Sequence, residues 1–295
     1  MSLIKGIYGA SLSIINNDLS LNIDKTIRHA ENIIDYGCHG AVFFGSTGQS
    51  QLVSLSEKIQ LINELTNSSY RERFIIGTGT NSLWDTINLM QISMQLGFDK
   101  FLIMPPAYYK YQDEDVINFY TKIINKLNDC KIILYNFEKL SGYKFSIDCI
   151  KKLVEKFPRQ IVAVKDSTYN LYENLKIENF LVFPGSELKL LKGLELGCSG
   201  IITATCNVTA NLSRKVFDDY FLGSSLLSNK LLCEVREVFD KYNLISGLHT
   251  YYANVNKDQI YKNILPPLSI LNSKDERELI ENLDKLNFSI KSFKA

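Results

Sequence analysis

The chain has 295 residues, of which 45% are hydrophobic and 22% are charged, and its formal net charge at pH 7 is +1. This composition is ordinary for a globular protein, and the near-zero net charge argues against a nucleic-acid-binding protein, which usually carries a basic face. No apolar run approaches the roughly 18 residues that a membrane-spanning helix needs, so we expect no membrane association.

The N-terminal residues and the cysteines indicate the cellular compartment. Residues 1–5 lack the extended apolar core of a signal peptide. No CxxC spacing occurs among the six cysteines, which are Cys38, Cys130, Cys149, Cys198, Cys206 and Cys233. We therefore expect reduced core thiols rather than disulfides, and a cytoplasmic protein.

Short apolar runs alternate with amphipathic segments from the start of the chain to beyond residue 220. The runs predict strands at 6–12, 41–45, 74–79, 101–105, 132–136, 161–166, 181–185 and 200–207. The segments between and after them predict helices near 22–36, 54–67, 82–96, 113–127, 146–156, 169–178, 187–197 and 209–221. Ser54 and Glu57 have the spacing of a capping box, and Gly37, Gly97 and Gly197 stand where helices should end.

Eight consecutive strand–helix units predict an α/β protein with a (β/α)8 TIM barrel. A doubly wound open sheet is the competing architecture, and the count of eight and the absence of a long linker favour the barrel. After residue 224 the strands cease, and helices are expected at 225–246, 251–263 and 274–291. We therefore divide the chain into a barrel over 1–224 and a helical appendage packed on it over 225–295.

Lys165 ends the apolar run Ile161–Val164, which is typical of a fully buried parallel strand. Desolvation favours the neutral form of an amine, and a neutral lysine is a nucleophile that forms a Schiff base with a carbonyl. The alternative is a lysine at the end of a strand whose ammonium reaches solvent.

The active site of a barrel lies at the carboxyl ends of its strands, so the residues at the other strand ends are further candidates. Ser46 and Thr47 lie in a glycine-flanked turn after the second strand, where hydroxyls and backbone N–H groups could hold a carboxylate, although the same turn could be a plain helix cap. Tyr135 ends the fifth strand and could carry protons beside an amine, or could be an ordinary core aromatic. The ends of strands six to eight add Ser167, Gly185, Glu187 and Thr205 as candidates for substrate binding.

These stretches together resemble the dihydrodipicolinate synthase/N-acetylneuraminate lyase family of pyruvate-dependent class I aldolases. The resemblance runs from about residue 4 to 270 and rests on GSTG at 45–48, PPAYYK at 105–110, YN at 135–136, LSG at 140–142, VAVKD at 162–166, GII at 200–202 with Asn207, and PPL at 266–268. It implies a (β/α)8 barrel, a carbon–carbon lyase activity and a homodimer or homotetramer. Because the lysine imine would be the electron sink, no metal or organic cofactor is then expected.

Carried over to this chain, the resemblance implies a role for each matched residue. Lys165 would form the imine with pyruvate, and Tyr135 would be the general acid and base. Ser46 and Thr47 would hold the pyruvate carboxylate, with Thr47 also relaying protons. Tyr108, or Tyr109 in an alternative register, would complete the hydroxyl relay across a subunit contact.

Two departures from the family bear on the substrate. The synthase branch has an arginine where this chain has Leu140, and LSG at 140–142 is similar to the lyase branch instead. Lys139 could partly replace that arginine, and Gln49 stands where the family usually has glutamate. We therefore expect cleavage of a 2-oxo-3-deoxy sugar acid, either sialic-acid-like or related to 2-oxo-3-deoxygluconate. The alternatives are 4-hydroxy-tetrahydrodipicolinate (dihydrodipicolinate) synthase, which condenses pyruvate with aspartate semialdehyde, and a non-catalytic 2-oxo acid binding protein.

Overall fold

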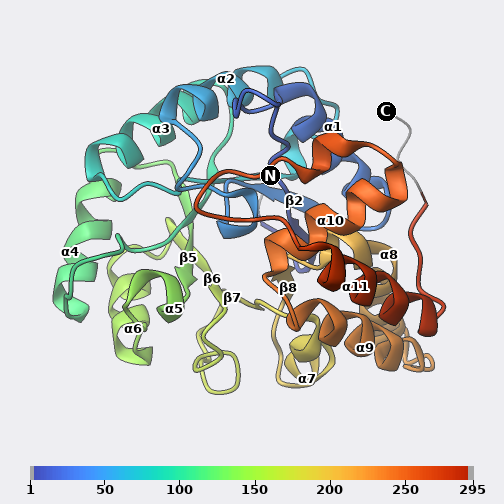
Figure 1. Ribbon diagram of the computed structural model, residues 1–295. Coiled ribbons are helices and arrows are strands. Elements are labelled where there is room, and N and C mark those ends of the chain that lie inside the picture. The colour runs from blue at the N-terminus through green and yellow to red at the C-terminus, as the bar shows by residue number, and fades with distance from the viewer. Residues whose placement is uncertain (1–2, 292–295) are drawn as a thin grey trace.

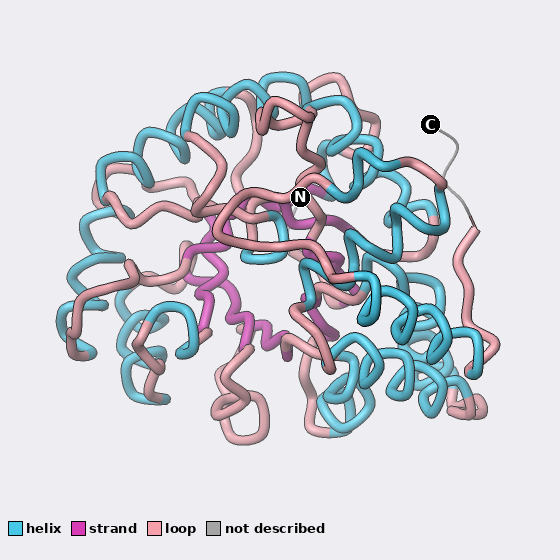
Figure 2. The backbone as a smooth tube through the Cα atoms, viewed as in Figure 1, coloured by secondary structure: helices cyan, strands magenta, loops and turns pink. Residues whose placement is uncertain are grey.

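The computed structural model describes residues 3–291, and its centre is a parallel sheet of eight strands. The strands are β1 (Gly6–Ala10), β2 (Gly40–Phe43), β3 (Phe74–Gly77), β4 (Lys100–Ile103), β5 (Lys131–Asn136), β6 (Ile161–Asp166), β7 (Leu181–Pro184) and β8 (Gly200–Thr203). Their spatial order, β7-β6-β5-β4-β3-β2-β1-β8, is the chain order of a barrel cut between β7 and β8. Figures 1 and 2 show the strands at the centre with helices around them, so the predicted barrel is confirmed.

The two edges of the sheet, β7 and β8, meet through Ser199. Its backbone N–H donates to the carbonyl of Val182 over 2.8 Å, and its hydroxyl accepts from the Val182 N–H over 3.3 Å. The Ser199 carbonyl in turn accepts from the N–H of Gly6 at the start of β1. The barrel is therefore nearly closed, and its strands are fixed relative to one another around the ring.

The interior of the barrel is filled by side chains from every strand. They form one buried cluster, composed of Tyr8, Val42, Ile75, Leu102, Ile133, Tyr135, Ala163, Phe183 and Ile202. Side chains alternate along a strand, so Lys165 points to the same side as Ala163, two residues before it. The sheet register then pairs Lys165 with Tyr135 on one side and with Phe183 on the other.

Helices surround the sheet and bury their apolar faces against it. They are α1 (Ile23–Asp35), α2 (Leu55–Leu65), α3 (Leu83–Gln95), α4 (Asp113–Ile124), α5 (Glu138–Ser141), α6 (Ile147–Lys156), α7 (Leu190–Glu195) and α8 (Cys206–Leu222). Ser54 and Glu57 form the predicted capping box of α2. Gly37, Gly97 and Gly197 follow α1, α3 and α7 with positive φ, which a glycine adopts at little cost, so these predicted helix ends are confirmed.

The helix predicted at 169–178 is wrong, because residues 167–180 form turns and bends instead. The carboxylate of Asp166 accepts hydrogen bonds from the backbone N–H groups of Tyr169, Leu171 and Tyr172, over 2.9, 2.9 and 3.0 Å. A side chain that binds these donors wraps the backbone around itself and competes with a helical ladder. The amphipathic spacing of this segment therefore reflects a packed loop.

The C-terminal helices are α9 (Ser228–Asp240), α10 (Leu244–Asn256) and α11 (Ser273–Lys285). The helix predicted at 225–246 breaks at Asn243, whose side chain caps the start of α10. These helices share a buried cluster with Leu12 and Ile14 of the barrel, and Figure 1 shows them together on one side of the molecule. We still propose the division after residue 224, between α8 and α9, as the boundary of the appendage. Within residues 3–291, no helix is both long and apolar enough to cross a membrane.

Candidate active site

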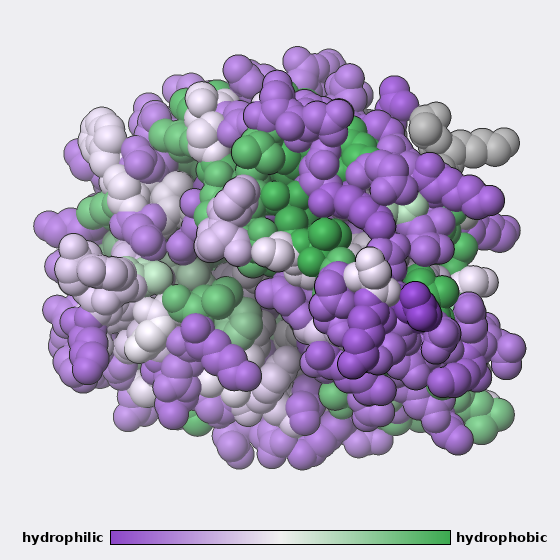
Figure 3. Space-filling model, viewed as in Figure 1, coloured by the Kyte–Doolittle hydropathy of each residue, from purple (hydrophilic) through white to green (hydrophobic). Residues whose placement is uncertain are grey.

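A large cavity of about 1080 Å³ opens at the carboxyl ends of the strands. Its wall comes from the segments that follow β2 to β8, from α9 and α10, and from Pro267 and Leu268. Figure 3 shows the molecule hollowed near the middle of this face, with apolar side chains beside the hollow and mostly hydrophilic ones on the surrounding surface. This is the end of the barrel at which we expected the chemistry.

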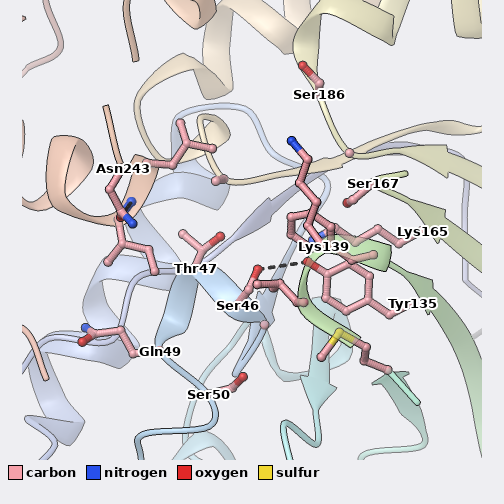
Figure 4. Close-up of a pocket in the computed structure, with 18 of the residues that line it drawn as sticks. Ser46, Thr47, Gln49, Ser50, Tyr135, Lys139, Lys165, Ser167, Ser186 and Asn243 are labelled. Atoms are coloured by element: carbon pink, nitrogen blue, oxygen red, sulfur yellow. Dashed lines mark hydrogen bonds between the residues drawn. The ribbon is translucent and has the colours of Figure 1, made fainter. Parts of the chain in front are cut away.

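Lys165, Tyr135 and Ser46 lie together in this cavity (Figure 4). The Lys165 Nζ atom lies 4.3 Å from the centroid of the Tyr135 ring, where the face of an aromatic ring attracts a cation. The Tyr135 hydroxyl is 2.9 Å from the Ser46 Oγ atom. Lys165 and Tyr135 are 3% and 4% exposed, so the amine and the phenol meet where little water reaches.

Lys165 differs from the other buried lysines of the described chain in what its amine contacts. The Lys58 Nζ atom donates to the carbonyls of Thr78 and Gly79, and the Lys100 Nζ atom donates to the carbonyl of Glu72. Within residues 3–291, the Lys165 Nζ atom has no hydrogen-bond acceptor, and the residue lines the cavity. Among these three buried lysines, Lys165 is therefore the one whose amine is available to a ligand.

The turn after β2 brings Ser46 and Thr47 to the cavity wall. It is a short 3-10 helix, Ser46–Gly48, in which Gly48 lies so close to the Ser11 carbonyl that an added Cβ would come within 3.0 Å of it. Gln49 follows with φ of +53° and is buried, and its Oε1 atom accepts from the backbone N–H of Leu265 over 2.6 Å. Gln49 therefore ties the turn to the C-terminal segment.

Ser167 and Gly185 form another part of the wall. A Cβ atom at residue 185 would lie 2.2 Å from the Ser167 Oγ atom, so a larger residue there would force the Ser167 hydroxyl to move. Both residues stand next to the strand ends that carry Lys165 and Pro184. The structure thus brings together Lys165 and Tyr135 with the predicted residues Ser46, Thr47, Ser167 and Gly185, all of which line the cavity.

Three predicted site residues lie elsewhere. Glu187 is fully buried behind the wall, where its Oε2 atom binds Arg236 and Thr203, each over 2.9 Å. Thr205 is also fully buried, and its Oγ1 atom has no hydrogen-bond partner among the described residues. Tyr108 is 89% exposed with φ of +88°, outside the cavity wall. A single copy of the chain therefore does not bring these three side chains to Lys165.

The contribution of the C-terminal helices to the cavity was not predicted from the sequence. Arg236 and Asp240 of α9 and Asn243 at the start of α10 line it. Arg236 is only 5% exposed and pairs with Glu187 and Asp240. Burial alone lowers the pKa of Arg236, but the two carboxylates outweigh it and leave that pKa raised. No local motif marks these residues, because they follow no strand.

Comparisons with known proteins add the relatives of this chain. A family model described as the dihydrodipicolinate synthetase family matches residues 3–284. N-acetylneuraminate lyase of Clostridium perfringens is 29% identical over 222 residues, covering 72% of this chain and 75% of the relative. 4-Hydroxy-tetrahydrodipicolinate synthase of Methanosphaera stadtmanae is 27% identical over 243 residues, covering 77% of this chain and 81% of the relative. The crystal structure of dihydrodipicolinate synthase from Aquifex aeolicus superposes with a TM-score of 0.88 at 22% identity, covering 98% of this chain and 100% of that structure.

Proposed function

The chain belongs to the dihydrodipicolinate synthetase family, and on that premise we propose that it cleaves a 2-oxo-3-deoxy sugar acid to pyruvate and an aldehyde through an imine on Lys165. It is a carbon–carbon lyase of the class I aldolase type. The observation that carries the proposal is the unpaired Lys165 amine, which lies over Tyr135 in a cavity large enough for a sugar acid.

The first half of the proposed reaction builds the imine. The neutral Lys165 amine attacks the C2 carbonyl of the substrate, and the resulting carbinolamine loses water to give a protonated imine. Tyr135 gives its proton to the departing hydroxyl, and the phenolate left behind accepts a hydrogen bond from Ser46, whose Oγ atom is 2.9 Å away. Ser46 and Thr47 hold the substrate carboxylate, so that C2 is presented to the amine.

The second half breaks the bond between C3 and C4. The Tyr135 phenolate takes the proton of the C4 hydroxyl and becomes a phenol again, the aldehyde leaves, and the electron pair of the broken bond moves onto the imine as an enamine. Protonation at C3 followed by hydrolysis then releases pyruvate and frees Lys165. The imine accepts the electron pair of the broken bond and returns it to C3 on protonation, so the reaction involves no net oxidation or reduction.

The segment after β5 favours the lyase over the synthase. Leu140 lines the cavity and is 44% exposed, and it offers an aldehyde carboxylate no charged hydrogen bond. The second candidate function is 4-hydroxy-tetrahydrodipicolinate synthase, which the relative from Methanosphaera stadtmanae supports, with Lys139 at the cavity in place of an arginine. A non-catalytic 2-oxo acid binder is the remaining outcome of the tests below.

We further propose a cytoplasmic homo-oligomer, a dimer or a tetramer. The six cysteines are free thiols, which suits a reducing compartment. Tyr108 and Tyr109 are 89% and 73% exposed, and large exposed aromatic side chains are typical of surfaces covered by a partner. In such an assembly, Tyr108 would reach the active site of a neighbouring subunit.

The test is chemical trapping of the imine. We expect pyruvate and borohydride to leave a stable adduct on Lys165, seen by peptide mass spectrometry. Lys165→Ala should abolish it, whereas Lys58→Met, which removes another buried lysine, should retain it. An adduct that persists in Lys165→Ala would contradict the proposal. N-acetylneuraminate, 2-oxo-3-deoxygluconate, and aspartate semialdehyde with pyruvate then separate the lyase from the synthase, and an adduct without turnover of any of them would indicate the binder.

A further inference from the structure

Some of the N–H donors of Arg236, at the cavity, have no acceptor among the described residues. A guanidinium has five N–H donors. The Nε atom donates to Asp240 over 2.9 Å, and the Nη1 atom donates to Glu187 over 2.9 Å and to Thr203 over 3.0 Å. Within residues 3–291, the two N–H groups of Nη2 have no acceptor. Arg236 is 5% exposed and lines the cavity, and Nη2 is not one of the fully buried atoms that lack a partner, so this donor pair is accessible from a space that a ligand can fill.

The Nη2 edge of the guanidinium can take an acceptor from a ligand without breaking the bonds to Glu187, Asp240 or Thr203. The ion pairs with Glu187 and Asp240 fix the guanidinium plane, so little side-chain freedom remains to be lost when a ligand binds. Arg236 comes from α9, whereas Lys165 is the second-to-last residue of β6. The edge therefore suits a group at a part of the ligand other than the carbonyl that Lys165 attacks.

Lys139 and Lys189 add two more cations to the same cavity. Neither forms an ion pair among the described residues, and Lys189 lies 5.8 Å from the centroid of the Tyr169 ring. In Figure 4 the Lys139 side chain extends through the cavity toward the side where Ser186 lies. On the acidic side, Asp240 is bound to Arg236, and Glu138 lies exposed next to Lys139 in the chain. The free donors thus outnumber the free carboxylates around this part of the wall.

We propose that Arg236, with Lys139 and Lys189, binds an oxyanion at the end of the substrate remote from Lys165. The group is a terminal carboxylate or phosphate on the half that leaves as the aldehyde. The inference rests on the proposed function and narrows its substrate class to sugar acids that are charged at both ends. Glu187, held by Arg236, is then a positioning residue for the guanidinium rather than the substrate-binding residue that the sequence predicted.

The test compares three substrates that differ at the distal end. These are 2-oxo-3-deoxygluconate with its neutral hydroxyl, its 6-phosphate, and 2-oxo-3-deoxyglucarate with a terminal carboxylate. We expect kcat/KM to favour at least one charged compound over the neutral one by about 10- to 100-fold, the worth of a charge-assisted hydrogen bond. Which charged compound is preferred identifies the oxyanion. Equal kcat/KM for all three would overturn the proposal.

Two variants assign the preference to these residues. Arg236→Lys keeps a cation beside Glu187 but loses the Nη2 donors of the guanidinium. Lys139→Met removes an exposed charge at little risk to folding. Both should lower the ratio of charged to neutral kcat/KM several-fold or more. Lys144→Met, which changes the net charge equally at an exposed position outside the cavity wall, should leave the ratio as it is. An unchanged ratio in both test variants would also overturn the proposal.

A binding measurement separates this proposal from the catalytic one. Calorimetry of the three compounds with the Tyr135→Phe variant reports the distal preference even without turnover. Tighter binding of a charged compound supports the oxyanion site, and equal affinity for all three contradicts it. Failure of the catalytic proposal would show separately, as the absence of a borohydride adduct on Lys165 in the native protein.

Discussion

Tyr135 serves two neighbours at once. Its ring face lies 4.3 Å from the Lys165 Nζ atom, and its hydroxyl is 2.9 Å from the Ser46 Oγ atom. The ring is held by its place in β5, paired directly with Lys165 in β6. The ring position and the hydroxyl function can therefore be separated by removing one oxygen atom.

The substitution Tyr135→Phe tests the hydroxyl. We expect kcat for cleavage to fall about 10²- to 10⁴-fold, the usual worth of a positioned acid–base group, because the ring stays but no proton donor remains. Stopped-flow or coupled assays measure the loss. Tyr70→Phe removes a hydroxyl that binds Asp35 at the surface and should leave kcat near the native value. A Tyr135→Phe enzyme within about threefold of the native kcat would exclude Tyr135 as the proton carrier.

At the level of whole elements, the loop between β6 and β7 depends on Asp166. The carboxylate is fully buried and also accepts from the Asn136 side chain over 2.8 Å, in addition to its three backbone donors. The loop carries Ser167 and Tyr169, which line the cavity next to Lys165. One buried side chain thus shapes a wall of the candidate active site.

Replacing Asp166 with Asn should loosen this loop. Donors approach both carboxylate oxygens, so either orientation of the amide sets its NH2 group against two of them. We expect the free energy of unfolding to fall by about 1–3 kcal/mol and kcat/KM to fall as the wall moves. Urea denaturation and steady-state kinetics measure the two effects. Asp129→Asn, at an exposed position, is the matched control. An Asp166→Asn protein as stable as the native one would show that the loop is held by other contacts.

Considered as a whole, the molecule carries its three histidines in environments that oppose protonation. Burial lowers the pKa of His29, His39 and His249 to about 4 in each case. The Nδ1 atom of His39 accepts from the Ile7 N–H, a bond that a protonated ring cannot make. The Nδ1 atom of His249 bonds the Tyr261 carbonyl, and its buried Nε2 atom has no acceptor among the described residues for a second proton.

These shifts predict a loss of stability in mild acid. Between pH 6.5 and about 4 the unfolded chain binds protons that the folded chain does not, so stability is full above pH 6.5 and declines as the pH falls toward 4. For the fully buried His29 and His249, each pH unit in this window costs up to about 1.4 kcal/mol per residue, and the half-buried His39 contributes less. Urea denaturation at pH 7, 6 and 5 measures the decline. His249→Gln should flatten the slope, and equal stability at pH 7 and pH 5 would contradict the prediction.

The eight strands, most of the helices between them and the candidate nucleophile could be predicted from the sequence. Apolar runs, capping residues such as Ser54 and a lysine at the end of a buried strand are local signals, readable without knowledge of the rest of the chain. Lys165 and Tyr135 also followed from the sequence, because parallel strands bring their carboxyl ends to the same face of a barrel.

Three features could be seen only in the three-dimensional structure. They are the loop around Asp166, the ion pair of Glu187 with Arg236, and the place of Arg236 in the cavity wall. Arg236 and Glu187 are 49 residues apart and meet because α9 packs across the end of the barrel. Such contacts depend on how the elements pack against one another, and the sequence around either residue carries no signal of that packing. For that reason the candidate nucleophile Lys165 could be predicted from the sequence, whereas the part of the cavity lined by Arg236 could be recognised only once the helices were in place.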